Sequence, residues 1–290
     1  MIITKITSGL GNQLFQYALG RALATERRTS LYFDLSYYKY TYATDTPRQF
    51  KLDRFAIDYR VLNGSPLEYV SKATKLFPGR TCRPFFQLVR ERHFHFDDTV
   101  LQARAALITL DGFWQSERYF RPHEALIRRE LAFANRPEPS FATYRDELAR
   151  SRTPISVHIR RGDYVNHPEF SKTFGFVGVG YYEHALRSMQ TRFPDARFFV
   201  FSDDQAWVRA HLSFPGDTVF VQHTGPDADV ADLQLMSRCR HHVIANSSFS
   251  WWGAWLNPAR DKVVVSPRQW YVNQPTWNTR DLLPEGWLTV

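Results

Sequence analysis

Cysteine is scarce in this 290-residue chain, which contains only Cys82 and Cys239, far apart in the sequence. Two cysteines exclude a disulfide scaffold and are typical of a reducing compartment. No apolar run approaches the ~18 residues of a membrane-spanning helix. The start, "MIITKITSGLGNQLF", reaches polar and glycine residues too early for a signal peptide. We therefore expect a cytoplasmic protein without membrane spans.

Blocks of about five or six consecutive Lys or Arg are also absent, although 37 Lys and Arg against 29 Asp and Glu give a net charge of +8. The positive excess favours a nucleic acid, an anionic membrane surface or a phosphorylated small molecule as partner. Nucleic-acid binding needs a basic face with aromatic platforms. The arginines here are scattered, and the aromatic run "YYKYTY" holds one lysine. We predict no nucleic-acid partner and no obligate protein partner.

Several catalytic and metal-binding motifs are missing. The chain has no Gly-x-Ser-x-Gly and no Walker loop, and "SGLGNQ" lacks the third glycine of a dinucleotide fingerprint. Cys239, His241 and His242 have no second pair at zinc-finger spacing, which favours burial over metal binding. Asp227 and Asp229 look like the paired acids of metal-dependent sugar transferases, but they lie in a polar turn before a helix, where acids are common. We predict no metal and no cofactor.

What the chain does contain is an alternation of strand and helix patterns. "MIITKIT", "SGLGNQ" and the helical spacing of "LFQYALGRALATE" open a β–loop–α–β unit, whereas residues 37–100 are irregular. Residues 134–141, "ANRPEPSF", hold two prolines and are the linker candidate. Strands and helices alternate again after it, which predicts a mostly parallel sheet. The length then favours two α/β domains, residues 1–140 and 141–290.

Polar residues follow four of the predicted strands. "HIRRGD" ends the strand 155–159, "SDD" ends 198–201, "NSSFS" ends 243–245, and "SGLGNQ" ends the first strand. Ligands of open parallel sheets bind outside the carboxyl ends of the strands, so these segments predict one binding site. An anion is the expected ligand, because an arginine fork fits phosphate oxygens and a serine-rich helix start offers N–H groups and hydroxyls.

The residues of "HIRRGD" also have purely structural interpretations, which stay open here. Alternation along the strand places Arg160 and Arg161 on opposite faces, so one is expected to reach the ligand while the other pairs with an acid. Asp163 either orients the arginine or caps the turn at Gly162. His158 lies inside the strand, where a core histidine is the commoner case.

The chain resembles the bacterial α-1,2-fucosyltransferases of glycosyltransferase family eleven. It is more distantly similar to the protein O-fucosyltransferases and the α-1,6-fucosyltransferases. The resemblance rests on "GLGNQLFQYALGRALA", "DGFWQSERYF", "HIRRGDYV", "FSDD" and "NSSFSWWGAWL", in the family's order. It covers most of the chain, and only residues 42–100 carry no family signature. It implies an α/β protein of the GT-B fold, with two Rossmann-like domains facing a central cleft. Residues 1–140 would be the acceptor side, and residues 141–290 would bind GDP-fucose.

The resemblance implies an inverting, metal-independent galactoside α-1,2-fucosyltransferase. Such an enzyme transfers L-fucose from GDP-fucose to the 2-hydroxyl of a terminal galactose in an oligosaccharide or O-antigen acceptor, and it releases GDP. GDP-fucose is then a donor substrate, and a galactose-terminated glycan is the other partner. A GDP-sugar-binding protein without activity is the alternative. Peripheral association with the inner membrane is a further option for a cytoplasmic enzyme of this kind.

The resemblance also assigns roles to individual residues. Arg160 is expected to grip the β-phosphate and Asp163 to hold the arginine loop, and these two form the predicted catalytic pair. Asp232 is expected to accept hydrogen bonds from guanine N1 and N2, and the alternative is that it only caps the helix that opens at "DLQLMS". Trp114 and Gln115 are expected to contact the acceptor. The rest of the expected donor-binding set consists of Gly9, Leu10, Gly11, Asn12, His158, Ser247, Ser248 and Phe249.

The chemistry of the expected reaction fits this set. Release of GDP places negative charge on the β-phosphate, and without a metal a fixed guanidinium and helix-end N–H groups must stabilise it. The transition state resembles an oxocarbenium ion, and the acceptor hydroxyl attacks from the opposite face with the help of a base. The base stays unassigned. The α-1,6 relatives have a glutamate where this chain has Pro168, and Glu169, Asp34 and Glu117 are the candidates.

Overall fold

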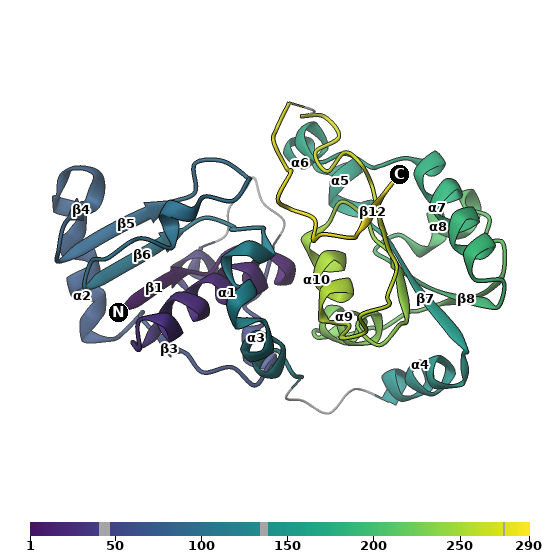
Figure 1. Ribbon diagram of the computed structural model, residues 1–290, viewed down its shortest axis with the longest axis horizontal. Helices are drawn as coiled ribbons and strands as arrows, with labels where there is room; N and C mark the ends of the chain where they lie inside the picture. The colour runs from purple at the N-terminus through teal and green to yellow at the C-terminus, as the bar shows by residue number, and fades with distance from the viewer. Residues whose placement is uncertain (41–46, 134–138, 275) are drawn as a thin grey trace. The chain divides into compact units, whose positions relative to one another are not determined.

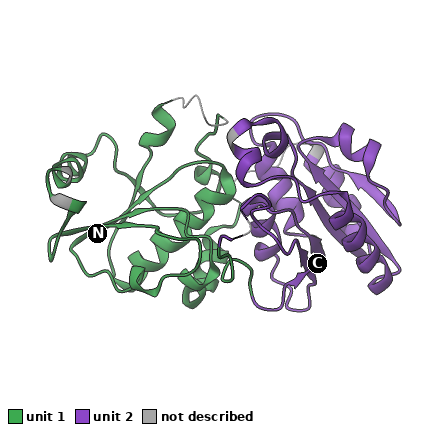
Figure 2. Ribbon diagram, turned by 90° about the horizontal axis from the view of Figure 1, so that it is seen from above, with its two compact units in different colours: residues 1–134, 278–284 green, residues 135–277, 285–290 purple. Residues whose placement is uncertain are grey.

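The computed structural model describes residues 1–40, 47–133, 139–274 and 276–290. It contains two α/β units (Figures 1 and 2). The first unit is Met1–Ala134 with Asn278–Pro284, and the second is Asn135–Trp277 with Glu285–Val290. The chain therefore divides after residue 134 and not after residue 140 as expected, and residues 278–284 group with the first unit instead of the second.

The first unit is built on a sheet whose described strands have the order β3-β2-β1-β6-β5-β4. All neighbouring strands are parallel except β4 and β5. The strands are β1 (Ile2–Lys5), β2 (Leu31–Asp34), β3 (Arg60–Val61), β4 (Thr81–Cys82), β5 (Phe86–Arg90) and β6 (Leu107–Asp111). The α-helices are α1 (Leu10–Glu26), α2 (Pro66–Ala73) and α3 (Glu124–Glu130). Short 3-10 helices are η1 (Ser36–Lys39), η2 (Leu52–Arg54), η3 (Thr74–Leu76), η4 (Pro78–Arg80), η5 (Asp98–Val100), η6 (Glu117–Tyr119) and η7 (Arg121–His123).

The prediction that residues 37–100 are irregular is wrong, because they hold α2 and three strands. The burial of α2 explains why its pattern is hard to see. Ser71 is buried in α2, and Thr74, directly after the helix, is buried as well. Leu67 packs against a small apolar cluster. Tyr69 and Leu76 are 76% and 85% exposed. The inward side thus carries polar Ser71 as well as apolar Leu67, and apolar Tyr69 and Val70 face outward, so the apolar residues do not form one continuous stripe.

Helix α1 packs tightly on β1. A Cβ added at Gly20 would collide with the side-chain oxygen of Thr4, so glycine is needed for the close approach of helix and strand. Nearly all of α1 is buried, including Leu14, Phe15 and Ala18. This packing fixes the start of α1, with the "GLGN" segment, next to the carboxyl end of β1.

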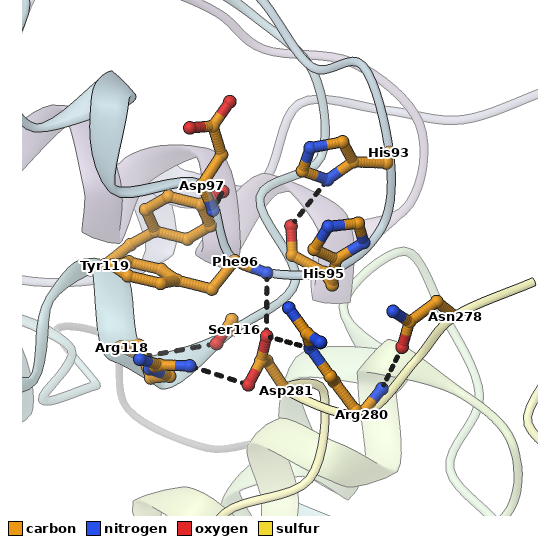
Figure 3. A network of polar contacts seen from close by, with 10 residues as sticks. All are labelled: His93, His95, Phe96, Asp97, Ser116, Arg118, Tyr119, Asn278, Arg280 and Asp281. Atoms are coloured by element: carbon orange, nitrogen blue, oxygen red, sulfur yellow. Dashed lines mark hydrogen bonds and ion pairs between the residues drawn. The ribbon is translucent and has the colours of Figure 1, made fainter.

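Residues 278–284 join the first unit through Asp281 (Figure 3). The Asp281 carboxylate accepts a hydrogen bond from Arg118 Nη1 at 2.7 Å and another from the backbone N–H of Phe96 at 3.2 Å. The Arg118 guanidinium also lies 4.4 Å from the centroid of the Phe96 ring. A contact over more than 160 residues leaves no local pattern in the sequence, which explains why the expected domain boundary placed this segment in the second unit.

The second unit has a fully parallel sheet, with the described strands in the order β12-β11-β10-β7-β8-β9. The strands are β7 (Thr153–Ile159), β8 (Ala196–Ser202), β9 (Asp217–Phe220), β10 (His241–Val243), β11 (Val264–Ser266) and β12 (Leu288–Thr289). The helices are α4 (Pro139–Arg150), α5 (Gly162–Asn166), α6 (Pro168–Thr173), α7 (Val179–Arg192), α8 (Gln205–His211), α9 (Ala228–Met236) and α10 (Ser248–Leu256). The chain starts in the centre at β7 and reverses direction at β10, so the topological switch point lies between β7 and β10.

The core of the second unit lies around β7, whose seven residues are all buried. Ile155, Val157 and Ile159 pack with Leu186 and Met189 of α7. The sequence of β7 alternates apolar Ile155, Val157 and Ile159 with polar Ser156 and His158, and the polar residues are buried as well, so both faces of the strand are covered. Each of the three apolar side chains contributes roughly 1.5–3 kcal/mol of burial free energy. The residues that follow Ile159 are therefore anchored to the best-packed part of the unit.

Candidate functional site

Arg160 follows β7 directly and is fixed by two carboxylates. Its Nη2 lies 2.7 Å from Asp163 Oδ1, and its Nη1 lies 3.0 Å from Asp203 Oδ2. The Arg160 side chain is 22% exposed. A guanidinium has more N–H groups than these two contacts use, so the remaining ones are available to an anion. Asp163 thus contacts the arginine side chain directly, which agrees with the first of its two open interpretations.

Arg161 points into different surroundings. Its Nε lies 3.1 Å from Asp204 Oδ2, and its guanidinium stacks 4.0 Å from the centroid of the Trp207 ring. The backbone N–H of Arg161 donates to Asp203 Oδ1 at 2.9 Å. An arginine that pairs with an acid and stacks on an indole serves the packing of α8 against the strand end. Arg161 is thus engaged within the unit, and Arg160 stays the predicted anion ligand of the two.

Asp203 was not among the predicted site residues, although the segment "SDD" drew attention to it. Asp203 contacts both arginines, and its carboxylate also lies too close to Gly162 for a larger residue to fit there without a shift. A Cβ at Gly162 would lie 2.7 Å from Asp203 Oδ2, closer than unbonded atoms tolerate. The carboxyl ends of β7 and β8 are thus locked together by charge and by close packing.

His158 is buried at 5% exposure, one residue before the end of β7. Burial and, to a lesser degree, the charge of Arg160 lower the pKa of His158 to about 3, so its ring is neutral near pH 7. Its Nδ1 has no hydrogen-bond partner among the described residues, and the ring lies 5.5 Å from that of Phe249. A neutral buried imidazole with an unused nitrogen fits either a core residue or a nucleotide contact.

The start of α10 supplies the second part of an anion site. Ser247 is buried and caps the helix, with its Oγ accepting from the N–H of Phe249 at 3.3 Å. Ser248 and Phe249 are half-buried, so the first turn of α10 reaches the surface. Because β10 neighbours β7 in the sheet, this turn and Arg160 follow adjacent strands. Helix N-termini bind anions through their unpaired N–H groups.

The side chain of Asn246 anchors the loop before α10 to neighbouring segments, a role that the sequence did not suggest. Its Nδ2 donates to the carbonyl oxygens of Trp270, Gly175 and Phe174 at 2.9, 3.2 and 3.3 Å. The backbone carbonyl oxygen of Asn246 accepts from the Tyr164 hydroxyl at 3.2 Å. The loop ahead of α10 is therefore tied to three neighbouring segments and is held in a defined position.

Asp232 lies in the second turn of α9, which begins at Ala228 with Asp227 in the cap position. Asp232 is therefore no helix cap. Its Oδ1 lies 2.7 Å from Nδ1 of His223, a residue that sequence reasoning missed. Burial raises the pKa of Asp232, and the hydrogen bond from His223 acts in the opposite direction. The Asp232 side chain is 24% exposed.

Asp227 and Asp229 lie at the cap position and in the first turn of α9, where acids favour the helix dipole. Asp229 Oδ1 accepts from the N–H of Val230 at 2.9 Å. Within the described ranges, no three His, Cys, Asp or Glu side chains are grouped as metal ligands would be. His242 instead bonds Ser156 Oγ at 2.7 Å and Asn257 Nδ2 at 2.9 Å.

The "GLGN" residues lie in the first unit. Gly9 is in the cap position of α1, and Leu10 and Gly11 are buried. Asn12 Oδ1 accepts from Gln115 Nε2 at 2.8 Å, so the start of α1 is joined to the loop after β6. This pair gathers the polar groups at the carboxyl ends of β1 and β6.

Trp114 differs from its expected role, because its ring is only 1% exposed and cannot present a face to an acceptor. Its backbone has φ 60°, a conformation that side chains other than glycine rarely adopt. Glu91 holds it there: its carboxylate accepts from the N–H groups of Phe113 and Trp114 at 2.7 and 2.9 Å. Burial raises the pKa of Glu91, and the two N–H groups oppose that shift. Glu91 was missed because it falls in the segment that seemed irregular.

The candidates for a catalytic base are not separated by their surroundings. Asp34 Oδ1 accepts from the N–H of Ser36 at 3.0 Å and from Asn63 Nδ2 at 3.3 Å, which gives it a structural role. Glu117 is half-buried in the first turn of η6. The side chain of Glu169 lies outside the described residues. The base therefore stays unassigned.

Comparison with known proteins adds the family. A model described as "Glycosyl transferase family 11" matches residues 100–290. The chain belongs to glycosyl transferase family 11. It is 33% identical to an α-1,2-colitosyltransferase of Escherichia coli, over 100% of this chain and 99% of that protein. It is 29% identical to the Escherichia coli O-antigen biosynthesis glycosyltransferase WbnK over 98% and 99%. A galactoside 2-α-L-fucosyltransferase of Caenorhabditis elegans is 28% identical over 91% and 71%.

Solved structures with the same fold confirm the predicted fold class. The fucosyltransferase NodZ from Bradyrhizobium matches with a TM-score of 0.51 at 17% identity, over 89% of this chain and 93% of that one. A mutant of Arabidopsis thaliana FUT1 in complex with GDP matches with a TM-score of 0.51 at 12% identity, over 99% and 75%. The family model and the full-length relatives confirm the resemblance to the α-1,2-fucosyltransferase family, and the solved structures show the α/β fold of the GT-B type. No helix in the described part of the chain is long and apolar enough to cross a membrane.

Proposed function

We propose that this enzyme transfers L-fucose from GDP-fucose to the 2-hydroxyl of a terminal galactose, with inversion at the fucose anomeric carbon. The acceptor would be an oligosaccharide or an O-antigen precursor. One observation carries the proposal: Arg160 is clamped by Asp163 and Asp203 at the switch point, beside the strand that leads into α10. A fixed guanidinium and a helix N-terminus suit a leaving diphosphate.

In the proposed reaction, the bond between the fucose anomeric carbon and the β-phosphate oxygen breaks, and its electron pair stays on the phosphate. Arg160 and the first turn of α10, with Ser247, Ser248 and Phe249, stabilise the charge that develops there. The galactose 2-hydroxyl bonds to the anomeric carbon from the opposite face and gives its proton to a base. The donor-binding role of Gly9, Leu10, Gly11, Asn12 and His158 is part of the same proposal.

Asp232 would select the base of the nucleotide. Guanine presents an N1–H and an N2 amine side by side, and one carboxylate can accept from both. Adenine and uracil lack this pair of donors. A site whose buried acceptor stays unpaired with the wrong base rejects it strongly. Asp232→Ala should then weaken GDP binding and flatten the preference for GDP over ADP and UDP in calorimetric titrations.

A second donor sugar deserves a direct test, because the chain is 33% identical over its whole length to an α-1,2-colitosyltransferase. Colitose is L-fucose without its 3-hydroxyl. A site that hydrogen-bonds this hydroxyl rejects the deoxy sugar by roughly 10⁴–10⁵, whereas a site without such a partner discriminates weakly. The ratio of kcat/KM for GDP-fucose and GDP-colitose therefore decides which sugar is the substrate.

The function is tested with purified protein, sugar-labelled GDP-fucose or GDP-colitose, and a panel of galactose-terminated oligosaccharides. We expect label in the oligosaccharide, one GDP released per sugar transferred, and an α-1,2 linkage in the product by NMR. Tight GDP binding with no transfer to any member of the panel would instead support a binding protein without activity.

Location and partners complete the proposal. We expect a cytoplasmic enzyme that works with its two substrates and without an obligate protein partner, with peripheral association at the inner membrane as an option. Cell fractionation at low and high salt separates these locations, because a peripheral protein held by charge leaves the membrane fraction as salt rises.

A further inference from the structure

His223 and Asp232 form a hydrogen-bonded pair that the predicted roles leave unexplained. Nδ1 of His223 lies 2.7 Å from Asp232 Oδ1. The His223 side chain is only 1% exposed, whereas Asp232 keeps 24% of its side chain exposed. With the carboxylate ionised, Nδ1 is the donor and Oδ1 the acceptor. The histidine thus meets the carboxylate from the protein interior and leaves carboxylate surface for a ligand.

The imidazole itself is held from two sides by α4. The Phe141 ring lies 6.3 Å from it at an interplanar angle of 27°, and the Tyr144 ring lies 5.3 Å from it, edge-on at 83°. The Tyr144 hydroxyl accepts from the N–H of Gln222 at 3.1 Å, which fixes the backbone next to His223. These two rings flank the imidazole, and its Nδ1 is directed at Asp232 by the hydrogen bond between them.

The second ring nitrogen supports one tautomer. His223 Nε2 is buried and has no hydrogen-bond partner among the described residues. An unpaired N–H in that position would cost more than an unpaired lone pair, because it would bury an unsatisfied donor. The Nδ1–H form satisfies the contact with Asp232 and leaves only a lone pair at Nε2. The pair therefore has a fixed donor and a fixed acceptor.

We propose that His223 is a positioning residue that holds the Asp232 carboxylate in the orientation needed to accept both guanine donors. The proposal rests on the proposed guanine-binding role of Asp232. Two parallel hydrogen bonds require the plane of the carboxylate to match the edge of the base. A carboxylate on a helix can rotate, and fixing it before binding removes that entropy loss. Buried partners behind a ligand-binding group commonly have this effect in metal sites as well.

A simpler interpretation is that His223 only fills space and satisfies a half-buried carboxylate. It predicts a loss of stability on substitution and an unchanged choice between nucleotides. The two interpretations differ in one quantity, the ratio of GDP to IDP affinity. Inosine diphosphate has the same phosphates, ribose and N1–H as GDP and lacks only the N2 amine. The ratio therefore reports whether the carboxylate still accepts from both donors.

The experiment is calorimetric titration of the full-length protein with GDP and with IDP. His223→Phe keeps a ring between Phe141 and Tyr144 but removes the donor, and it should lower GDP affinity about tenfold, since hydrogen bonds to charged groups are of this size. It should also bring the GDP to IDP ratio closer to one. His223→Gln, which can still donate, should recover part of the ratio. His242→Phe is the matched control: it removes a buried histidine that bonds Ser156 and Asn257 instead of Asp232, and it should lower Tm without changing the ratio.

Asp232→Ala separates the two proposals. If it keeps the wild-type ratio, Asp232 does not read guanine, and the role of His223 fails with it. If Asp232→Ala brings the ratio of GDP to IDP affinity to one while His223→Phe keeps the wild-type ratio, the guanine role of Asp232 stands. The positioning role of His223 is then overturned. If the phenylalanine variant does not fold, His223→Leu, which also lacks a donor, takes its place with the same expected result.

Discussion

The strand ends of the two units are held in place by opposite means. In the second unit, Arg160 and Asp203 are about a quarter exposed and hold each other through charge. In the first unit, the half-buried Glu91 holds the backbone of Phe113 and Trp114 through its carboxylate. The first arrangement presents a guanidinium between two carboxylates, and the second uses a carboxylate to shape a loop. We propose that the first binds a charged donor and that the second shapes a surface for an uncharged glycan.

The largest effect should come from removing the guanidinium of Arg160. We expect Arg160→Lys to lower kcat by roughly 10²–10³, because an ammonium cannot bond Asp163, Asp203 and a phosphate in the same geometry. Arg161→Lys is the matched control, since it makes the same change one residue later. It should lose the stacking on Trp207 and some stability while keeping most of the activity. Steady-state kinetics with saturating acceptor measures both, and near-normal turnover of the Arg160 variant would remove this residue from the mechanism.

A smaller effect is expected from Glu91, and it should fall on the other substrate. Glu91→Gln replaces one acceptor oxygen by an amide that faces a backbone N–H, which should cost about 1–3 kcal/mol of unfolding free energy. The strained loop at Trp114 should then loosen, raising KM for the acceptor while the Kd for GDP stays the same. An equal loss of GDP affinity would show that the two strand ends are not separate in function.

The same comparison shows what a sequence can reveal. Arg160, Asp163 and Asp203 lie in short polar segments directly after apolar strands, so chain order alone brings them together at the ends of β7 and β8. Glu91 acts through a contact with Phe113, 22 positions along the chain, and His223 acts through a contact with Asp232, 9 positions along. Both residues lie in segments without a periodic pattern. Sequence reasoning finds groups that face a ligand more readily than the groups behind them.

The predicted fold class is correct, and the parts of the fold that the sequence did not predict were missed for a related reason. The alternation of strands and helices in the second unit is easy to recognise in the sequence, because its central strands are buried on both faces. The helix α2 was missed because Ser71 is buried and Tyr69 is exposed, against the usual periodicity. Residues 278–284 were placed in the wrong unit because Asp281 binds Arg118 over a long sequence separation. Patterns encode the local elements, and the side chains that join distant segments are visible only in three dimensions.

Acid should act on the two strand ends in opposite directions. The pKa of His158 is lowered to about 3 by burial, so below pH 6.5 the unfolded chain binds a proton that the native ring does not. Stability is then lost as pH falls, by about 1 kcal/mol at pH 5.5. The pKa of Glu91 is raised by burial, so protonation favours the native state as pH falls. Thermal melts should show a flatter acid slope for His158→Gln and a steeper one for Glu91→Gln, and parallel slopes for both variants and wild type would contradict the assignment.

The smallest expected effect is that of a chelator, for which we predict no change in rate. The charge on a leaving diphosphate must be neutralised by a metal or by fixed protein groups. In the second unit, Arg160 and the first turn of α10 are available for this task. Asp227 and Asp229, the acids that most resemble a metal motif, lie at the start of α9, where the helix dipole accounts for them. Initial rates should therefore agree with and without EDTA, and Asp229→Asn should keep its activity. Loss of activity in EDTA with rescue by Mn²⁺ or Mg²⁺ would instead assign the acids to a metal and reduce Arg160 to a supporting role.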